Sequence, residues 1–137
     1  MPGQSLFSQH LKIMIKAPKP DDRKLWRDSY YHKLFGFKAA LEAERVLKFF
    51  EKERPNDKRP RDAIKAIKAW AEGKCILGMK EVRRLSLDAH AAARDAISNE
   101  AKYAAHAAGQ AVRTWHVPTH ALGAFSYAAK AITVSKK

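Results

Sequence analysis

Residues 89–131 read AHAAARDAISNEAKYAAHAAGQAVRTWHVPTHALGAFSYAAKA, and 16 of these 43 positions are alanine. Alanine is the best helix former, and its short side chain lets the axes of two helices approach closely. Each alanine contact buries little apolar area, so larger side chains must supply most of the stability. The stretch therefore predicts closely packed helices, with much of the buried area expected from Phe49, Phe50, Trp70, Trp115, Phe125 and Tyr127.

Two helices with clear ends are predicted before this stretch. Apolar residues between positions 37 and 53 recur on one broad helical face, and charged residues occupy the other. The loop ERPNDKRPRD follows at 53–62, and its second proline, Pro60, suits the first turn of the next helix. That helix carries Ile64 and Trp70 on its apolar face and is expected to end at Gly73.

Two positions decide how the alanine-rich part is divided. Positions 82–96 form a helix, after which Ser98 or Asn99 caps a new helix, or the first helix bends and runs on. Pro118 lacks a backbone N–H donor, so the chain is broken or kinked there before helix resumes through residue 132. With short connections, the prediction is an all-α compact bundle or stack of about five helices in helical hairpins, Pro-kinked near residue 118.

One domain is expected, because 137 residues suit a single core. Residues 1–20 form a strand or an irregular arm, and a helix that begins after Asp21 and Asp22 is expected to end near Gly36. We therefore divide the chain into a basic N-terminal arm or helix at 1–36, packed on an Ala-rich helical domain at 37–137. No apolar run is long enough for a signal peptide or a membrane span. The single cysteine, Cys75, favours a reducing compartment, so a cytoplasmic location is predicted.

Positive charge dominates the sequence and limits the kinds of partner that the protein is expected to bind. The formal net charge is +13, and residues 1–84 hold 21 of the 27 Lys and Arg against 11 of the 14 Asp and Glu. Such a surface attracts acidic proteins or polyanions, although it can also serve solubility alone. A nucleic-acid-binding protein is therefore the alternative interpretation, with contacts expected from Lys24, Trp26, Arg27, Tyr30, Tyr31 and Lys33.

Two groups of polar residues are candidates for a site. In the loop, Arg59, Arg61 and Asp62 stand at a helix start, where they either create an anion site or form a solvated connector. In the connector interpretation, Asp62 offsets the helix dipole and pairs with Arg59 or Arg61. His90 and Arg94 lie four residues apart and therefore share one helical face, with a structural role for His90 as the simpler interpretation.

His116 and His120 are also four residues apart, a spacing that can place two imidazoles on one face for a metal. Pro118 weakens that geometry and no H-E-x-x-H motif is present, so we favour a structural role and predict no metal. The sequence also has no Gly-rich phosphate loop, no G-x-S-x-G elbow and no Cys/His pair with a nucleophile context. A non-enzymatic protein without a cofactor is therefore predicted.

Three motifs resemble a known family. The segments RPRDAIKAIKAWAEGK, EVRRLSLDAHAAARDA and AAGQAVRTWHVPTHALGAFSYAAKAI are similar to small bacterial and archaeal helical proteins described as putative immunity proteins, which are associated with polymorphic toxin systems. The resemblance covers roughly residues 37–134. It implies that the matching positions, Arg59, Pro60, Arg61, Asp62, His90, Arg94, His116, Pro118 and His120, form one polar cluster between helices. Residues 1–36 depart from the family's pattern, being unusually basic and aromatic.

The resemblance implies a protein-binding module that neutralises a partner protein by covering its functional surface. Like charges oppose association, so a protein of net charge +13 is a poor match for a strongly basic nuclease. The expected partner is a toxin with an acidic or neutral face.

Overall fold

A computed structural model describes residues 30–137, and every regular element in that range is an α-helix. In chain order the helices are α2 (Tyr30–Glu53), α3 (Arg59–Ala71), α4 (Met79–Asp95), α5 (Asn99–Arg113) and α6 (His120–Ser135). The predicted all-α class is confirmed. No helix within the described range is long and apolar enough to cross a membrane.

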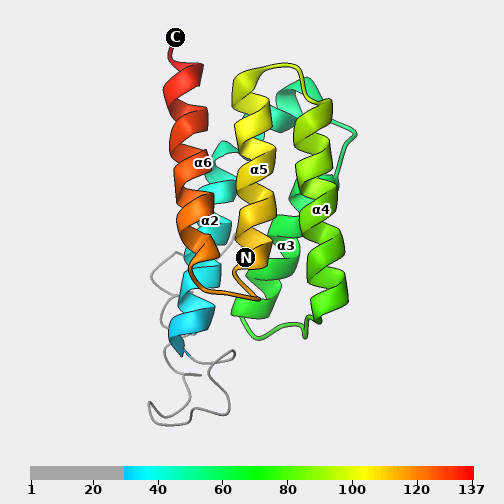
Figure 1. Ribbon diagram of the computed structural model, residues 1–137, viewed down its shortest axis with the longest axis vertical. Coiled ribbons are helices and arrows are strands. Elements are labelled where there is room, and N and C mark those ends of the chain that lie inside the picture. The colour runs from blue at the N-terminus through cyan, green and yellow to red at the C-terminus, as the bar shows by residue number, and fades with distance from the viewer. Residues whose placement is uncertain (1–29) are drawn as a thin grey trace, which may run out of the picture.

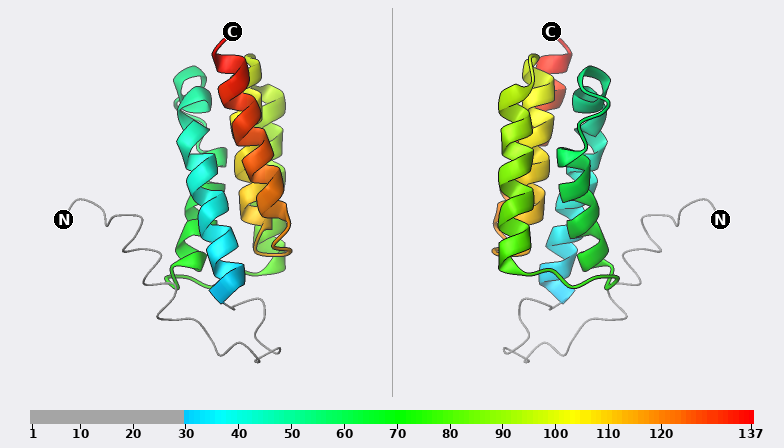
Figure 2. Two further views of the ribbon diagram at one scale, coloured as in Figure 1. Left: turned by 90° about the vertical axis from the view of Figure 1, so that its left-hand side faces the viewer. Right: turned by 90° about the vertical axis from the view of Figure 1, so that its right-hand side faces the viewer.

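The helices form two layers that pack face to face. In Figure 1, α4, α5 and α6 lie side by side in front, with α5 in the middle, and α2 and α3 lie behind them. Figure 2 shows the same two layers edge-on. Consecutive helices run antiparallel because each connection is short, as the hairpin prediction required.

Helix α5 is the centre of the packing, and nearly all the residues that it buries are small. It contacts each of the other four helices. Its buried residues are Ala101, Ala104, Ala105, Ala107, Ala108, Gly109, Ala111 and Val112. Helix α6 packs against α5 and α2, and its four buried residues are all alanines, Ala121, Ala124, Ala128 and Ala131. The sequence prediction of closely packed alanine helices is therefore confirmed.

Larger apolar side chains gather in the back layer. Phe37 and Phe50 of α2 are fully buried, as is Ile67 of α3, and Trp70 is 3% exposed. Trp115 is also buried, whereas the predicted contributors Phe49, Phe125 and Tyr127 are only partly buried and pack against the edge of the core.

Gly36 does not end a helix, so that prediction is wrong. Helix α2 runs without interruption from Tyr30 to Glu53. A Cβ atom at position 36 would lie 3.1 Å from a ring carbon of Trp70 and 3.5 Å from side-chain carbons of Ile67. The glycine is therefore needed for the close approach of α3 to α2 and not for a helix end.

The helix ends predicted at proline, serine and glycine are found where expected. Pro60 occupies the first turn of α3, and Gly73 follows that helix with a φ of 74°, a conformation that favours glycine. The side chain of Ser98 accepts a hydrogen bond from the N–H of Ala101 at 3.2 Å, so a new helix starts there and α4 does not run on.

Around Pro118 the chain is broken, and the predicted kink is replaced by a full reversal. Helix α5 ends at Arg113, a series of turns follows, and α6 starts at His120 in the opposite direction. The N–H groups of His116 and Val117 both donate to the carbonyl of Arg113, at 2.9 and 3.2 Å. Those bonds close the last turn of α5 before the proline, which cannot extend it.

Candidate functional site

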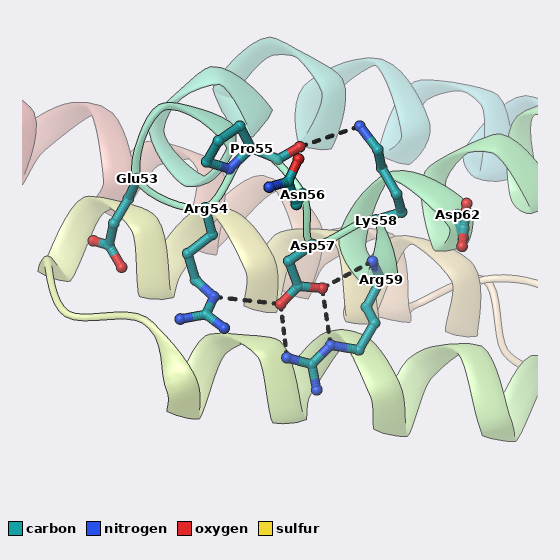
Figure 3. Close-up of a pocket in the computed structure, with 8 residues that line it drawn as sticks. All are labelled: Glu53, Arg54, Pro55, Asn56, Asp57, Lys58, Arg59 and Asp62. Carbon is teal, nitrogen blue, oxygen red and sulfur yellow. Dashed lines mark hydrogen bonds and ion pairs between the residues drawn. The ribbon is translucent and has the colours of Figure 1, made fainter.

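Ion pairs within the chain hold the arginine-rich loop between α2 and α3 (Figure 3). The guanidinium of Arg59 donates to both carboxylate oxygens of Asp57, at 2.9 and 2.7 Å, and to Asp95 at 2.9 Å. Arg54 also donates to Asp57, at 3.4 Å. The hydrogen bonds from Arg59 outweigh the effect of burial and lower the pKa of Asp57 to about 2. This carboxylate is therefore ionised at neutral pH, and both of its oxygens accept hydrogen bonds from arginines.

Arg61 forms a second ion pair, which the sequence interpretation missed. Its Nε and Nη2 atoms donate to the two carboxylate oxygens of Glu51, at 2.6 and 2.5 Å. The predicted pairing of Arg59 or Arg61 with Asp62 is wrong, because Asp62 lies apart on the first turn of α3 (Figure 3). Asp57 precedes the helix and pairs with Arg59 at its start, while Glu51 pairs with Arg61 from the last turn of α2.

The hollow beside this loop offers an anion few free donors. It is an open depression of about 570 Å³ lined by residues 53–59 and Asp62. An anion at a helix start needs free N–H donors. Here the N–H of Arg59 already donates to Asp57 at 3.2 Å, and Pro60 has no N–H. The guanidinium groups of Arg59 and Arg61 are likewise engaged by carboxylates.

Glu53 stabilises the same end of the bundle, although no sequence pattern singles this residue out. Its two carboxylate oxygens accept hydrogen bonds from the backbone N–H groups of Ile97 and Ser98, at 2.7 and 2.9 Å. Burial opposes ionisation, but the bonds from Ser98 and Ile97 prevail and lower the pKa of Glu53. The end of α2 is thereby tied to the turn between α4 and α5, so this network is structural.

A pair of histidines joins α4 to α5 in the front layer. The Nδ1 atoms of His90 and His106 lie 2.6 Å apart, so one ring donates its N–H to the other. Burial, followed by the charges of His106, Arg113 and Arg94, lowers the pKa of His90 to about 4. Burial and the nearby cations also lower the pKa of His106. Both rings are therefore neutral at pH 7.

Gly109 makes room for the His90 ring, which leads to a test of this contact. A Cβ atom at position 109 would lie 2.6 Å from Nε2 of His90. We expect Gly109→Ala to destabilise the protein by about 1 kcal/mol, because displacing the ring outweighs the gain in helix propensity. In a His90→Ala background the same change should instead stabilise by about 0.5 kcal/mol. Urea unfolding of the four proteins in this cycle measures both values, and an unchanged sign would show that the ring does not require the glycine.

His116 and His120 do not share a helical face, in agreement with the expectation that Pro118 disturbs the four-residue geometry. His116 lies in the turn after α5, and His120 is the first residue of α6. His120 Nδ1 is 3.0 Å from Oε1 of Gln110, and burial, Arg113 and His116 lower the pKa of His120. Among residues 30–137, no group of three His, Cys, Asp or Glu side chains is arranged to hold a metal ion.

The direct contacts of the predicted site residues lie in three places. Arg59 and Arg61 lie in the loop network, His90 contacts His106 between α4 and α5, and His120 contacts Gln110 between α5 and α6. His116 lies in the turn between α5 and α6, and its Nδ1 is buried without a hydrogen-bond partner among the described residues.

One strip of α5 remains at the surface. From Ala101 to Arg113 every residue is buried except Lys102, Tyr103, His106, Gln110 and Arg113. Their spacing of three and four places them on one side of the helix, between α4 and α6. We call this strip the three-helix face, together with the neighbouring residues His90 and Arg94 of α4 and His120, Tyr127 and Lys130 of α6. From the sequence, residues of this face were predicted only on α4 and at the start of α6. The spacing of three and four between the polar residues of α5 could have indicated the α5 residues as well.

Two tyrosines and a lysine continue the three-helix face toward α6. The rings of His106 and Tyr127 stack with centroids 5.1 Å apart, and Tyr103 lies 6.2 Å from Tyr127. The ammonium of Lys130 lies over both tyrosine rings, 5.3 Å from Tyr127 and 6.0 Å from Tyr103. These polar aromatic side chains join α5 and α6 on the outside of the alanine contacts that the two helices bury.

Only half of the residues expected to contact nucleic acid can be placed. Lys24, Trp26 and Arg27 lie outside the described residues. Tyr30, Tyr31 and Lys33 begin α2; the two tyrosine rings are 5.0 Å apart, and Lys33 lies over the ring of Trp70.

Comparison with known proteins identifies a family. A family model described as Imm-5 like putative immunity protein matches residues 34–137. This match confirms the resemblance predicted from the motifs over residues 37–134. No curated protein and no solved structure matches the chain significantly.

Proposed function

The chain belongs to the family of Imm-5 like putative immunity proteins, and we propose that it neutralises a partner protein, a toxin, by covering the partner's functional surface with a helical face. The proposal is non-enzymatic and assigns no cofactor. It places the complex in the cytoplasm, because a lone cysteine suits a reducing compartment.

The observation that carries this proposal is an excess of positive charge on a closely packed helical body. Residues 30–137 hold 21 Lys and Arg against 11 Asp and Glu, a net charge of +10. Complementary potentials speed association and like charges oppose it. The charge therefore supports a target with an acidic or neutral face and argues against a strongly basic nuclease.

Growth rescue tests the proposal directly. Each protein encoded beside this chain is expressed alone and together with it in a bacterial host. We expect one neighbour to arrest growth, co-expression to restore it, and the two proteins to co-elute as a complex. The proposal fails if no neighbour is toxic, or if the toxic neighbour is neither bound nor inhibited. Tight inhibition of a strongly basic nuclease would refute the charge argument.

Salt-dependent gel shifts separate this function from nucleic-acid binding. A nucleic-acid-binding protein would retain an oligonucleotide at low salt and lose it steeply as salt rises. We expect no retention at physiological salt.

A further inference from the structure

We propose that the three-helix face is the docking surface of this protein and that it receives an acidic segment of the partner protein. The inference rests on the proposed function and names the surface that would carry it out. Four cations define the surface, Arg94 of α4, Lys102 and Arg113 of α5 and Lys130 of α6, together with the rings of Tyr103 and Tyr127.

The four cations differ from the loop arginines in having no carboxylate partner. Arg54, Arg59 and Arg61 all donate to carboxylates of the chain itself. Within residues 30–137, by contrast, Arg94, Lys102, Arg113 and Lys130 form no ion pair. The charge of the loop is therefore already neutralised, whereas the charge of the three-helix face is available to a partner.

Three of these cations lie close enough to the same histidines to interact with them electrostatically. Arg94 and Lys102 both act electrostatically on His106, Arg113 and Arg94 act on His90, and Arg113 acts on His120. An imidazole cannot offset a cation in either protonation state, and the stretch of α5 from Lys102 to Arg113 contains no Asp or Glu that could do so. A carboxylate that arrives there meets positive charge on both sides of α5.

The aromatic groups favour a protein segment over a nucleic acid. Stacking of bases on a single-strand platform requires open ring faces. Tyr127 is already stacked by His106, and Lys130 lies over Tyr127 and Tyr103. The hydroxyls of Tyr103 and Tyr127 make no hydrogen bond within the described residues, so they remain donors for carboxylates. Tyrosine and arginine are also the side chains that protein interfaces favour.

Two triple variants of the full chain test the location with equal change of charge. The face variant is Arg94→Glu/Arg113→Glu/Lys130→Glu. The matched control is Lys38→Glu/Lys48→Glu/Lys52→Glu, which reverses three exposed lysines of α2 that also form no ion pair. Far-UV circular dichroism checks that both variants fold, and glutamine replaces glutamate at the three positions of both variants if the face variant does not.

The probe is a peptide of ten glutamates, and an oligothymidine of equal charge is the competitor. We expect the peptide to shift amide signals of α4, α5 and α6 in NMR spectra of the wild-type protein. Its binding should weaken about tenfold or more in the face variant and less than about twofold in the α2 control. The control reports any loss due to net charge alone.

The docking proposal is overturned if the peptide does not bind, if its shifts map to α2, or if both variants lose binding equally. Tighter binding of oligothymidine at the same face overturns it in favour of nucleic acid. Growth rescue is a separate measurement, so a failed peptide experiment with intact rescue would reject the surface and leave the immunity function standing.

Discussion

Ala128→Leu is expected to destabilise the protein by about 3 kcal/mol, at the upper end of what overpacking of a core usually costs. Ala128 has no exposed surface and lies where α6 packs on α5 and α2. Every residue that α6 buries is an alanine, so the helix axes are close and α6 itself contributes no flexible side chain that could move aside. The added carbons can be accommodated only if α6 moves away from α5.

Its neighbour provides the control. Ala129 is exposed on the same helix, and Ala129→Leu should change the stability by less than about 0.5 kcal/mol. Urea unfolding of both variants measures how much more stability the added carbons cost at the buried position than at the exposed one. Equal stability of the two variants would mean that α6 is not held by close contact of small residues.

Acidification from pH 6.5 to pH 4 is expected to remove about 2 kcal/mol of stability through His90 alone, after allowance for the partial exposure of its ring. Burial and the neighbouring His106, Arg113 and Arg94 lower the pKa of His90 to about 4 in the folded protein. The lowered pKa values of His106 and His120 act in the same direction.

The sign follows from the protons bound in each state. Between pH 6.5 and pH 4 the unfolded chain protonates His90 and the folded chain does not, so the free energy of unfolding decreases as the pH falls. Above pH 6.5 both states are neutral at this site and the effect vanishes. Loss of the ionised form of Asp57, whose pKa is about 2, follows only below about pH 4 and is therefore separable.

Urea unfolding at pH 7.5, 6.5, 5.5 and 4.5 measures this dependence. A His90→Gln variant should show a clearly shallower decline, whatever its stability at pH 7.5. A flat profile for the wild-type protein between pH 6.5 and pH 4.5 would contradict the assignment of neutral, buried imidazoles.

Local chain chemistry explains which parts of the fold could be predicted from sequence. Pro60, Gly73 and Ser98 each act on their own backbone, so the ends of α3 and the start of α5 follow from residue type. Gly36 misled the prediction because its role is tertiary: it accommodates Trp70, which lies 34 positions further along the chain. Nothing near Gly36 in the sequence signals that contact.

The candidate site was harder to predict for the same reason. The family motifs selected His90, but its partner His106 is set by the register in which α4 packs against α5. Arg61 looked available because its partner, Glu51, lies on another helix, and Asp95, the second partner of Arg59, does so too. An arginine that has an ion-pair partner looks the same in the sequence as one that has none. Only the packed structure distinguishes the two.

The central position of α5 has a consequence for how the molecule unfolds. Its buried residues, almost all alanines, pack against four different helices, and each alanine contributes little area to these contacts. A fragment lacking any one outer helix would leave part of that column in water, where alanines alone bury too little area to hold the remaining helices together. The protein should therefore melt as one cooperative unit, and isolated hairpins cut from it should stay largely unstructured in solution.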